Sequence, residues 1–231
     1  MAQVRKLVLP NGMTVVPGDW TAAVPLFSTV EVAAGPIPAL FAFSYTSGDT
    51  VPGSLGPRMA TPLDTNLQGE GSKLPENEEL VIHTMMISAF KTGPNTTAAN
   101  GLFPDAEVPE VPLPDMLRLQ RDMLIKLNIA AVKNYTESTM DYWPAAAGVQ
   151  HMYSGGLNRP NGATGTAVAY NGSVCTNGNR KFASPLYVAG GESFRVECVP
   201  NRGSVEGLGL APTSRIQLRI YLDGFRRRPV A

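Results

Sequence analysis

The amino-acid sequence predicts an all-β protein: one antiparallel β-sandwich over residues 1–231, with long loops and at most one or two short helices. Three observations support this fold class. The 23 glycines and 20 prolines divide the 231 residues into short elements joined by turns, as many-stranded sandwiches require. Apolar residues make up 43% of the chain, enough for one sizeable core. The C-terminal quarter alternates between apolar and polar residues, which is the period of a strand.

That alternation is clearest from Arg215 to Leu222, where every even-numbered residue is Ile or Leu and the odd-numbered residues are Arg, Gln or Tyr. Four matches in a row to a period of two predict a strand with one buried face. The segment Ser193–Val199 alternates in the same way and should point Phe194, Val196 and Cys198 into the core. The glycine pair before it predicts a tight hairpin turn over Ala189–Glu192.

The middle of the chain supplies two more predicted strands and a helix. Leu80–Phe90 is apolar at both odd and even positions, as expected for a strand buried on both faces. Met123–Val132 alternates and should be a second strand. Asp115–Asp122 follows Pro114 and spaces its apolar residues at helical turns, which predicts a short helix.

The remaining segments are short strands and three long loops. Phe27–Val32 and Leu40–Tyr45 carry the β-branched and apolar residues of short strands. Thr46–Leu63, Thr92–Pro114 and Ala145–Arg180 are rich in Gly, Pro, Asn or Ala and predict loops, the last with one weak strand near Thr166 to Tyr170. Loops of this length in a compact domain are usually functional.

Charge and reactive residues favour a structural protein over an enzyme. Lys+Arg and Asp+Glu both count 19, so the net charge is zero and no overall attraction to nucleic acid or anionic membrane is expected. His83 lies in an apolar strand, His151 has no acidic neighbour in sequence, and Cys198 should be an inert core thiol while Cys175 lies in a loop. The sequence contains no nucleophile elbow, phosphate loop or zinc spacing. We therefore expect no catalytic residue, no cofactor and no metal ligand.

One stretch resembles the start of a calcium-binding loop. Asp64–Gly69 offers alternating oxygen ligands and a glycine, but Pro75 stands at the twelfth position, where such a loop needs a bidentate glutamate. The stretch is therefore predicted to be a surface turn. The acidic residues that follow, Glu76, Glu78 and Glu79, are predicted to form a solvated rim before the buried strand.

Several segments together resemble the single jelly-roll capsid proteins of tailless icosahedral bacteriophages. They are Phe41–Phe43, Asp64–Leu67 leading through Leu74 and Pro75 into the Leu80 strand, Leu127–Tyr135, Trp143–Gly148, Pro185–Val196, and Arg219–Gly224 followed by Arg228–Val230. The resemblance implies two four-stranded sheets, assembly into a virion shell with copies of itself and other capsid proteins, and a shell that can enclose an internal viral membrane. It implies no catalytic residues and no specific nucleic acid.

The end of the chain is the predicted assembly interface. The last strand is expected to end at Asp223-Gly224, so that Phe225, Arg226, Arg227 and Arg228 leave the sheet as a short tail. Aromatic residues and arginine are enriched in protein interfaces. On this view, removing residues 225–231 should impair assembly and leave the fold intact.

An alternative is a ligand-binding β-sandwich of the carbohydrate-binding type. Trp20, Tyr142, Trp143 and Tyr153 could supply flat faces on which sugar rings stack. Regular assemblies of the purified protein would favour the shell subunit, whereas a persistent monomer would favour the ligand-binding module.

Overall fold

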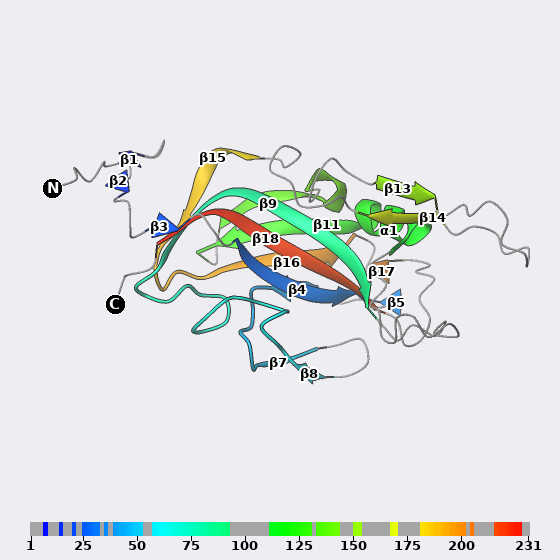
Figure 1. The fold of residues 1–231 in the computed structure, drawn as a ribbon, viewed down its shortest axis with the longest axis horizontal. Coiled ribbons are helices and arrows are strands. Elements are labelled where there is room, and N and C mark those ends of the chain that lie inside the picture. Colours follow the sequence, from blue (N-terminus) through cyan, green and yellow to red (C-terminus); the bar gives the residue numbers. More distant parts are fainter. Residues whose placement is uncertain are drawn as a thin grey trace, which may run out of the picture.

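The protein is an antiparallel all-β sandwich with one α-helix among its described residues (Figure 1). The computed structural model describes residues 7–8, 14–15, 20–21, 25–32, 35–36, 39–52, 57–92, 111–130, 133–143, 150–153, 167–170, 181–201, 204–205 and 215–227. The principal strands are β4 (Leu26–Val32), β6 (Leu40–Ala42), β9 (Glu79–Thr92), β11 (Met123–Ile129), β12 (Lys133–Thr139), β15 (Lys181–Val188), β16 (Phe194–Pro200) and β18 (Arg215–Arg227).

The smaller elements are pairs or short groups of residues. They are β1 (Leu7–Val8), β2 (Thr14–Val15), β3 (Trp20–Thr21), β5 (Gly35–Pro36), β7 (Thr50–Val51), β8 (Arg58–Met59), β10 (Val111–Pro112), α1 (Leu113–Asp122), the 3-10 turn η2 (Met140–Tyr142), β13 (Gln150–Tyr153), β14 (Ala167–Tyr170) and β17 (Ser204–Val205).

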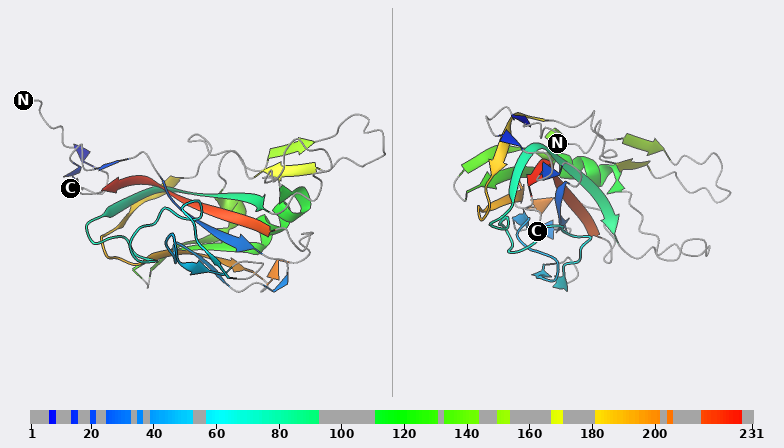
Figure 2. Two further views of the ribbon diagram at one scale, coloured as in Figure 1. Left: turned by 60° about the horizontal axis from the view of Figure 1, so that its bottom comes forward. Right: turned by 60° about the vertical axis from the view of Figure 1, so that its left-hand side comes forward.

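The eight principal strands form two facing sheets (Figure 2). The first sheet, called here the β18 sheet, has the order β15-β9-β18, and β4 and the short β3 both pair with β18 on its other side. The second sheet, called here the β16 sheet, has the order β12-β11-β16-β6. Numbered along the chain from one to eight, the strands therefore run 6-3-8-1 in one sheet and 5-4-7-2 in the other. Only the β11–β12 connection joins two principal strands that are consecutive in the chain and also paired.

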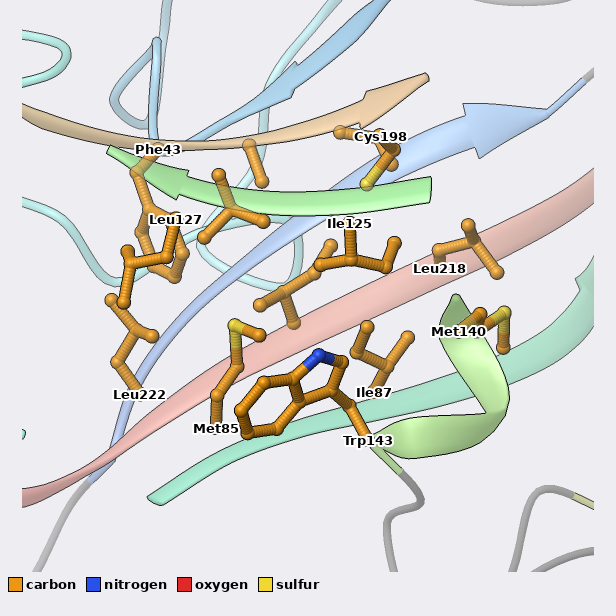
Figure 3. Close-up of a cluster of buried hydrophobic side chains, with 14 of the residues drawn as sticks. Phe43, Met85, Ile87, Ile125, Leu127, Met140, Trp143, Cys198, Leu218 and Leu222 are labelled. Carbon is orange, nitrogen blue, oxygen red and sulfur yellow. The ribbon is translucent and has the colours of Figure 1, made fainter. Parts of the chain in front are cut away.

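The core lies between the two sheets (Figure 3). The side chains predicted to point inward are fully or almost fully buried, which confirms that prediction: Phe194, Val196, Ile216, Leu218 and Ile220. Cys198 is fully buried as expected, and burial raises the pKa of its thiol to about 12, with a smaller contribution from nearby Glu197. Met116 and Leu119 bring the predicted helix, observed as α1, into the same core.

The turn over Ala189–Glu192 connects two strands that do not pair. The sequence predicted a hairpin here, but β15 pairs with β9 in one sheet and β16 pairs with β11 and β6 in the other. The hairpin prediction is therefore wrong, although the turn itself is tight. Gly190 has no room for a side chain, because a Cβ atom would lie 2.1 Å from the carbonyl oxygen of Glu76.

The strand predicted to end at Asp223-Gly224 continues to Arg227, so that prediction is also wrong. The Asp-Gly pair marks a β-bulge instead of a turn: Asp223 pairs with Thr84 and Gly224 with Ile82, which leaves His83 as the extra residue. A Cβ atom on Gly224 would lie 1.9 Å from the carbonyl oxygen of Val81, so only glycine fits. Residues 225–227 are consequently part of the sheet, and deleting them would remove paired strand residues.

All three predicted loops contain short strands, since β10 lies near the end of Thr92–Pro114. Thr46–Leu63 includes the paired β7 and β8, and Ala145–Arg180 includes β13 as well as the expected β14, which pair with each other beside β10. Short, polar or small-residue strands of this kind carry too little periodicity to be recognised. Most of Thr92–Pro114, residues 93–110, lies outside the described residues.

Candidate functional site

The predicted interface residues are largely held by partners within the fold. Phe225 lies in β18 with its ring against the edge of His83, at a centroid distance of 5.2 Å. Arg226 is 6% exposed, and its guanidinium contacts the carboxylate of Glu78 at 2.7 Å from Nε and 2.5 Å from the terminal nitrogen. Arg228 lies outside the described residues.

The neighbouring ion pair, between Arg227 and Glu79, is more exposed than the pair between Arg226 and Glu78. Arg227 is about half exposed at its side chain, at 45%, and contacts Glu79 at 3.3 Å. Of the predicted interface residues that the structure describes, Arg227 is therefore the most accessible to another molecule. Glu78, predicted to stand on a solvated rim, is 6% exposed and forms the buried pair with Arg226, so the prediction is wrong for this residue, whereas Glu76 is exposed as expected. The carboxylate of Glu78 can be buried because its counterion, Arg226, lies beside it on β18.

A second group of charged residues lies on the outer face of the β18 sheet, and we call it the outer-face cluster: Glu31, Arg58, Asp64 and Gln217. Nε of Arg58 donates to Glu31 at 2.6 Å, and its two terminal nitrogens donate to the two oxygens of Asp64 at 2.8 Å each. Gln217 donates to the same oxygen of Glu31 at 3.4 Å. Arginine forms such paired, two-pronged contacts with carboxylates because its donors match their geometry.

Asp64 is the acceptor at the centre of this arrangement. It also receives hydrogen bonds at 2.8 Å from the amide and the hydroxyl of Thr61. Burial raises the pKa of Asp64, but the hydrogen bonds from Arg58 and Thr61 outweigh burial and hold that pKa at about 2. The carboxylates in turn raise the pKa of Arg58 above its usual value. Both carboxylate oxygens of Asp64, which a calcium ion would need as ligands, are bound by Arg58. The stretch is also not the exposed surface turn that was predicted, since Asp64 is 6% and Thr65 1% exposed.

Arg219 fastens the same segment to the sheet at a second point. It donates to the hydroxyl of Thr29 at 3.1 Å and to the carbonyl oxygen of Leu63 at 2.7 Å. Its guanidinium lies over the rings of Phe27 and Phe90, at 5.3 and 5.0 Å from their centroids. Such contacts between a cation and an aromatic ring add to the attraction. The segment that carries Arg58, Asp64 and Leu63 is thus held across the outer face of the sheet.

The anchored segment exposes two large apolar side chains. Met59 is 66% exposed and Leu63 is 75% exposed, although the charged residues on either side of this stretch, Arg58 and Asp64, are held in ion pairs. We call this pair the 59/63 tip. The contacts of Arg58 that hold this segment are partly buried, and Arg219 adds an exposed hydrogen bond to the carbonyl oxygen of Leu63, so the segment is tied to the sheet at two points.

The outer-face cluster makes the free energy of unfolding depend on pH in the acid range. The folded pKa of Asp64, about 2, lies below its ordinary value of 3.8, so its contribution to stability is complete above pH 3.8 and is lost as the pH falls through about 2. We expect Asp64→Asn to lower the free energy of unfolding at neutral pH by about 2 kcal/mol, less than for a fully buried pair because Arg58 is partly exposed. The variant should also show a shallower acid-induced decline, measured by urea denaturation at a series of pH values.

Glu70→Gln is the control for that titration, because Glu70 is 73% exposed at its side chain and forms only a surface pair with Lys73. It should leave the acid-induced decline of stability unchanged. An Asp64→Asn protein that loses stability with acid as steeply as the unmodified protein would contradict the assignment.

The residues proposed for sugar stacking do not form one surface. Trp143 is 3% exposed and packs in the core, where its indole nitrogen donates to Ser138 at 2.5 Å. Its faces are therefore not accessible, and the prediction is wrong for this residue. Tyr142 is 43% exposed. The side chains of Trp20 and Tyr153 lie outside the described residues.

Within the described ranges no group of three or more His, Cys, Asp and Glu side chains is arranged to hold a metal ion. Nor is any described helix long and apolar enough to cross a membrane. A comparison of the chain with protein-family models, with curated proteins and with solved structures finds no match. The fold and its anchored surface segment thus define an antiparallel β-sandwich protein.

Proposed function

We propose that this chain is a structural virion protein, a capsid shell subunit that assembles with copies of itself and with other capsid proteins. The proposal includes no catalytic activity and no cofactor. Its interface comprises the 59/63 tip together with the exposed end of β18 at Arg227.

The order of the strands supports a jelly-roll topology. Jelly rolls consist of eight strands in two sheets, built from two Greek keys, in which a strand returns by a long connection to lie beside an earlier one. The orders 6-3-8-1 and 5-4-7-2 have this character, since β18, the last strand, lies between β4, the first, and β9, the third. A fold by itself does not imply a function, so the functional claim depends on the surface.

The single observation that carries the functional claim is the 59/63 tip. Met59 and Leu63 are large apolar side chains exposed on one short segment, and exposed apolar surface of this kind suits a protein interface. Here Arg58 and Arg219 secure the segment through Glu31, Asp64 and the carbonyl oxygen of Leu63, so little conformational freedom would be lost when a second subunit covers the tip.

Assembly of the purified protein tests the proposal. Sedimentation and negative-stain electron microscopy should show regular particles for the unmodified chain. The double variant Met59→Gln with Leu63→Gln should raise the concentration needed for assembly by about tenfold or more, because it removes two apolar anchors that each contribute about 1 kcal/mol. Its melting temperature should stay unchanged, since both side chains are exposed.

Leu117→Gln is the matched control, because Leu117 is 44% exposed on α1, away from the tip, and glutamine suits a helix. It should assemble like the unmodified protein. If the unmodified chain stays monomeric at high concentration, the shell proposal fails and the ligand-binding sandwich replaces it. If the double variant assembles normally, the interface is elsewhere.

A further inference from the structure

A pocket of about 300 Å³ opens at one end of the β16 sheet, and neither residue of the 59/63 tip lines it. It is lined by Ser72, Asn128, Ser193, Phe194 and Arg195. Asn128 is the penultimate residue of β11 and pairs directly with Arg195 near the start of β16. The volume of the pocket is at the lower end of the range for small-molecule sites.

The backbone around the pocket is fixed before any ligand arrives. The amide of Ser72 donates to the carbonyl oxygen of Phe43 at 2.6 Å, and the carbonyl oxygen of Ser72 accepts from Phe194 at 2.8 Å. The carbonyl oxygen of Ser193 accepts from Ala130 at 2.7 Å. These bonds join segments from four parts of the chain, so the pocket walls are preorganised for binding.

Three polar side chains in this pocket have no partner within the part of the chain that the structure describes. The hydroxyls of Ser72 and Ser193 and the amide of Asn128 make no hydrogen bond to it, although all three residues are partly buried. Together they offer both donors and acceptors at short range. An apolar ligand would cover these groups without satisfying them, which is unfavourable.

The charge beside the pocket is balanced. One terminal nitrogen of Arg195 lies 2.6 Å from a carboxylate oxygen of Glu197, and the guanidinium also lies 5.0 Å from the centroid of the Phe41 ring. An anion would have to compete with Glu197 for this arginine. The remaining guanidinium donors can still serve a neutral oxygen acceptor.

From the pocket and its unpartnered polar groups we infer that this site binds a small neutral polyhydroxylated molecule of the size of a monosaccharide. Hydroxyl groups of such a molecule can both donate to and accept from Asn128, Ser72 and Ser193, and a ring oxygen or hydroxyl can accept from Arg195. The site is independent of the shell proposal, because it does not include the 59/63 tip.

Ligand-observed saturation-transfer NMR tests this inference on the full chain, and it works for monomers and large assemblies alike. The probes are D-glucose, D-galactose and N-acetyl-D-glucosamine, with sodium acetate as the anionic probe. At least one sugar should bind with a dissociation constant of about 1 mM, as expected for a few hydrogen bonds in an open pocket. Acetate should bind more weakly.

Two variants and one matched control localise the binding. Asn128→Ala and Ser193→Ala should each weaken binding of that sugar by about fivefold to tenfold. Asn134→Ala, an exposed asparagine on the adjacent β12, should leave it unchanged. The inference is overturned if no sugar binds, if both pocket variants bind as well as the unmodified protein, or if acetate alone binds in a way that depends on these residues. Particle formation, measured in parallel, should be the same for all three variants.

Discussion

Replacing Arg226 by alanine should lower the free energy of unfolding by about 3–5 kcal/mol, the loss expected when one partner of a buried ion pair is removed. Both side chains of the pair are 7% exposed, so Glu78 would be left as a buried charge without its counterion. The even-numbered residues of β18 face the core, and Arg226 continues this series toward the inside of the sandwich. Urea denaturation monitored by tryptophan fluorescence would measure the change.

The next residue provides the control. Arg227→Ala removes a pair of the same chemistry, but the Arg227 side chain is 45% exposed, so the loss should be at most about 1 kcal/mol. The combined variant Arg226→Met with Glu78→Leu should recover most of the lost stability, because it removes both charges and keeps the volume. If Arg226→Ala and Arg227→Ala lowered the free energy of unfolding equally, burial of the ion pair would not explain the loss of stability.

Leu218→Ala should cost about 2–5 kcal/mol of unfolding free energy, because it removes buried apolar surface and leaves a cavity. Leu218 is fully buried in β18, the strand at the centre of its sheet, where it pairs with Val30 of β4 on one side and Ala89 of β9 on the other. Strands on both sides restrict how far the backbone can relax into the cavity. Chemical denaturation should therefore give a large decrease with an unchanged dependence on denaturant.

Leu117→Ala makes the same chemical change at a leucine that is 44% exposed on α1. Its effect should stay within about 0.5 kcal/mol, as for most surface substitutions. A loss near zero for Leu218→Ala, or equal losses at the two leucines, would contradict the assignment of the core face.

Elements with a local signal could be predicted from the sequence. The alternation in Arg215–Leu222 and Ser193–Val199 reflects one buried face, and the apolar run at Leu80–Phe90 reflects two, since Val81 and Met86 are buried on the side opposite the shared core. Helix α1 was also predicted, because proline at its start and helical spacing are local features.

The candidate sites could not be predicted in the same way. Arg58 looked like part of a loop, and the sequence gives no sign that it bridges Glu31, 27 residues away, and Asp64. Asn128 and Ser193 are ordinary polar residues until strand pairing places them around one pocket. Glu78 and Arg226 are 148 positions apart, so neither could be recognised as buried from its own surroundings.

The sequence by itself thus determined the fold class, most of the principal strands, helix α1 and the residues that face the core, because burial of a strand face imposes a period of two on neighbouring residues. The tertiary structure alone decided which strands pair, that β15 and β16 separate into different sheets, and that Asp223-Gly224 forms a bulge and not an end. These features depend on which backbone groups and charges meet across distant segments. Each such contact joins residues that leave no shared pattern along the chain.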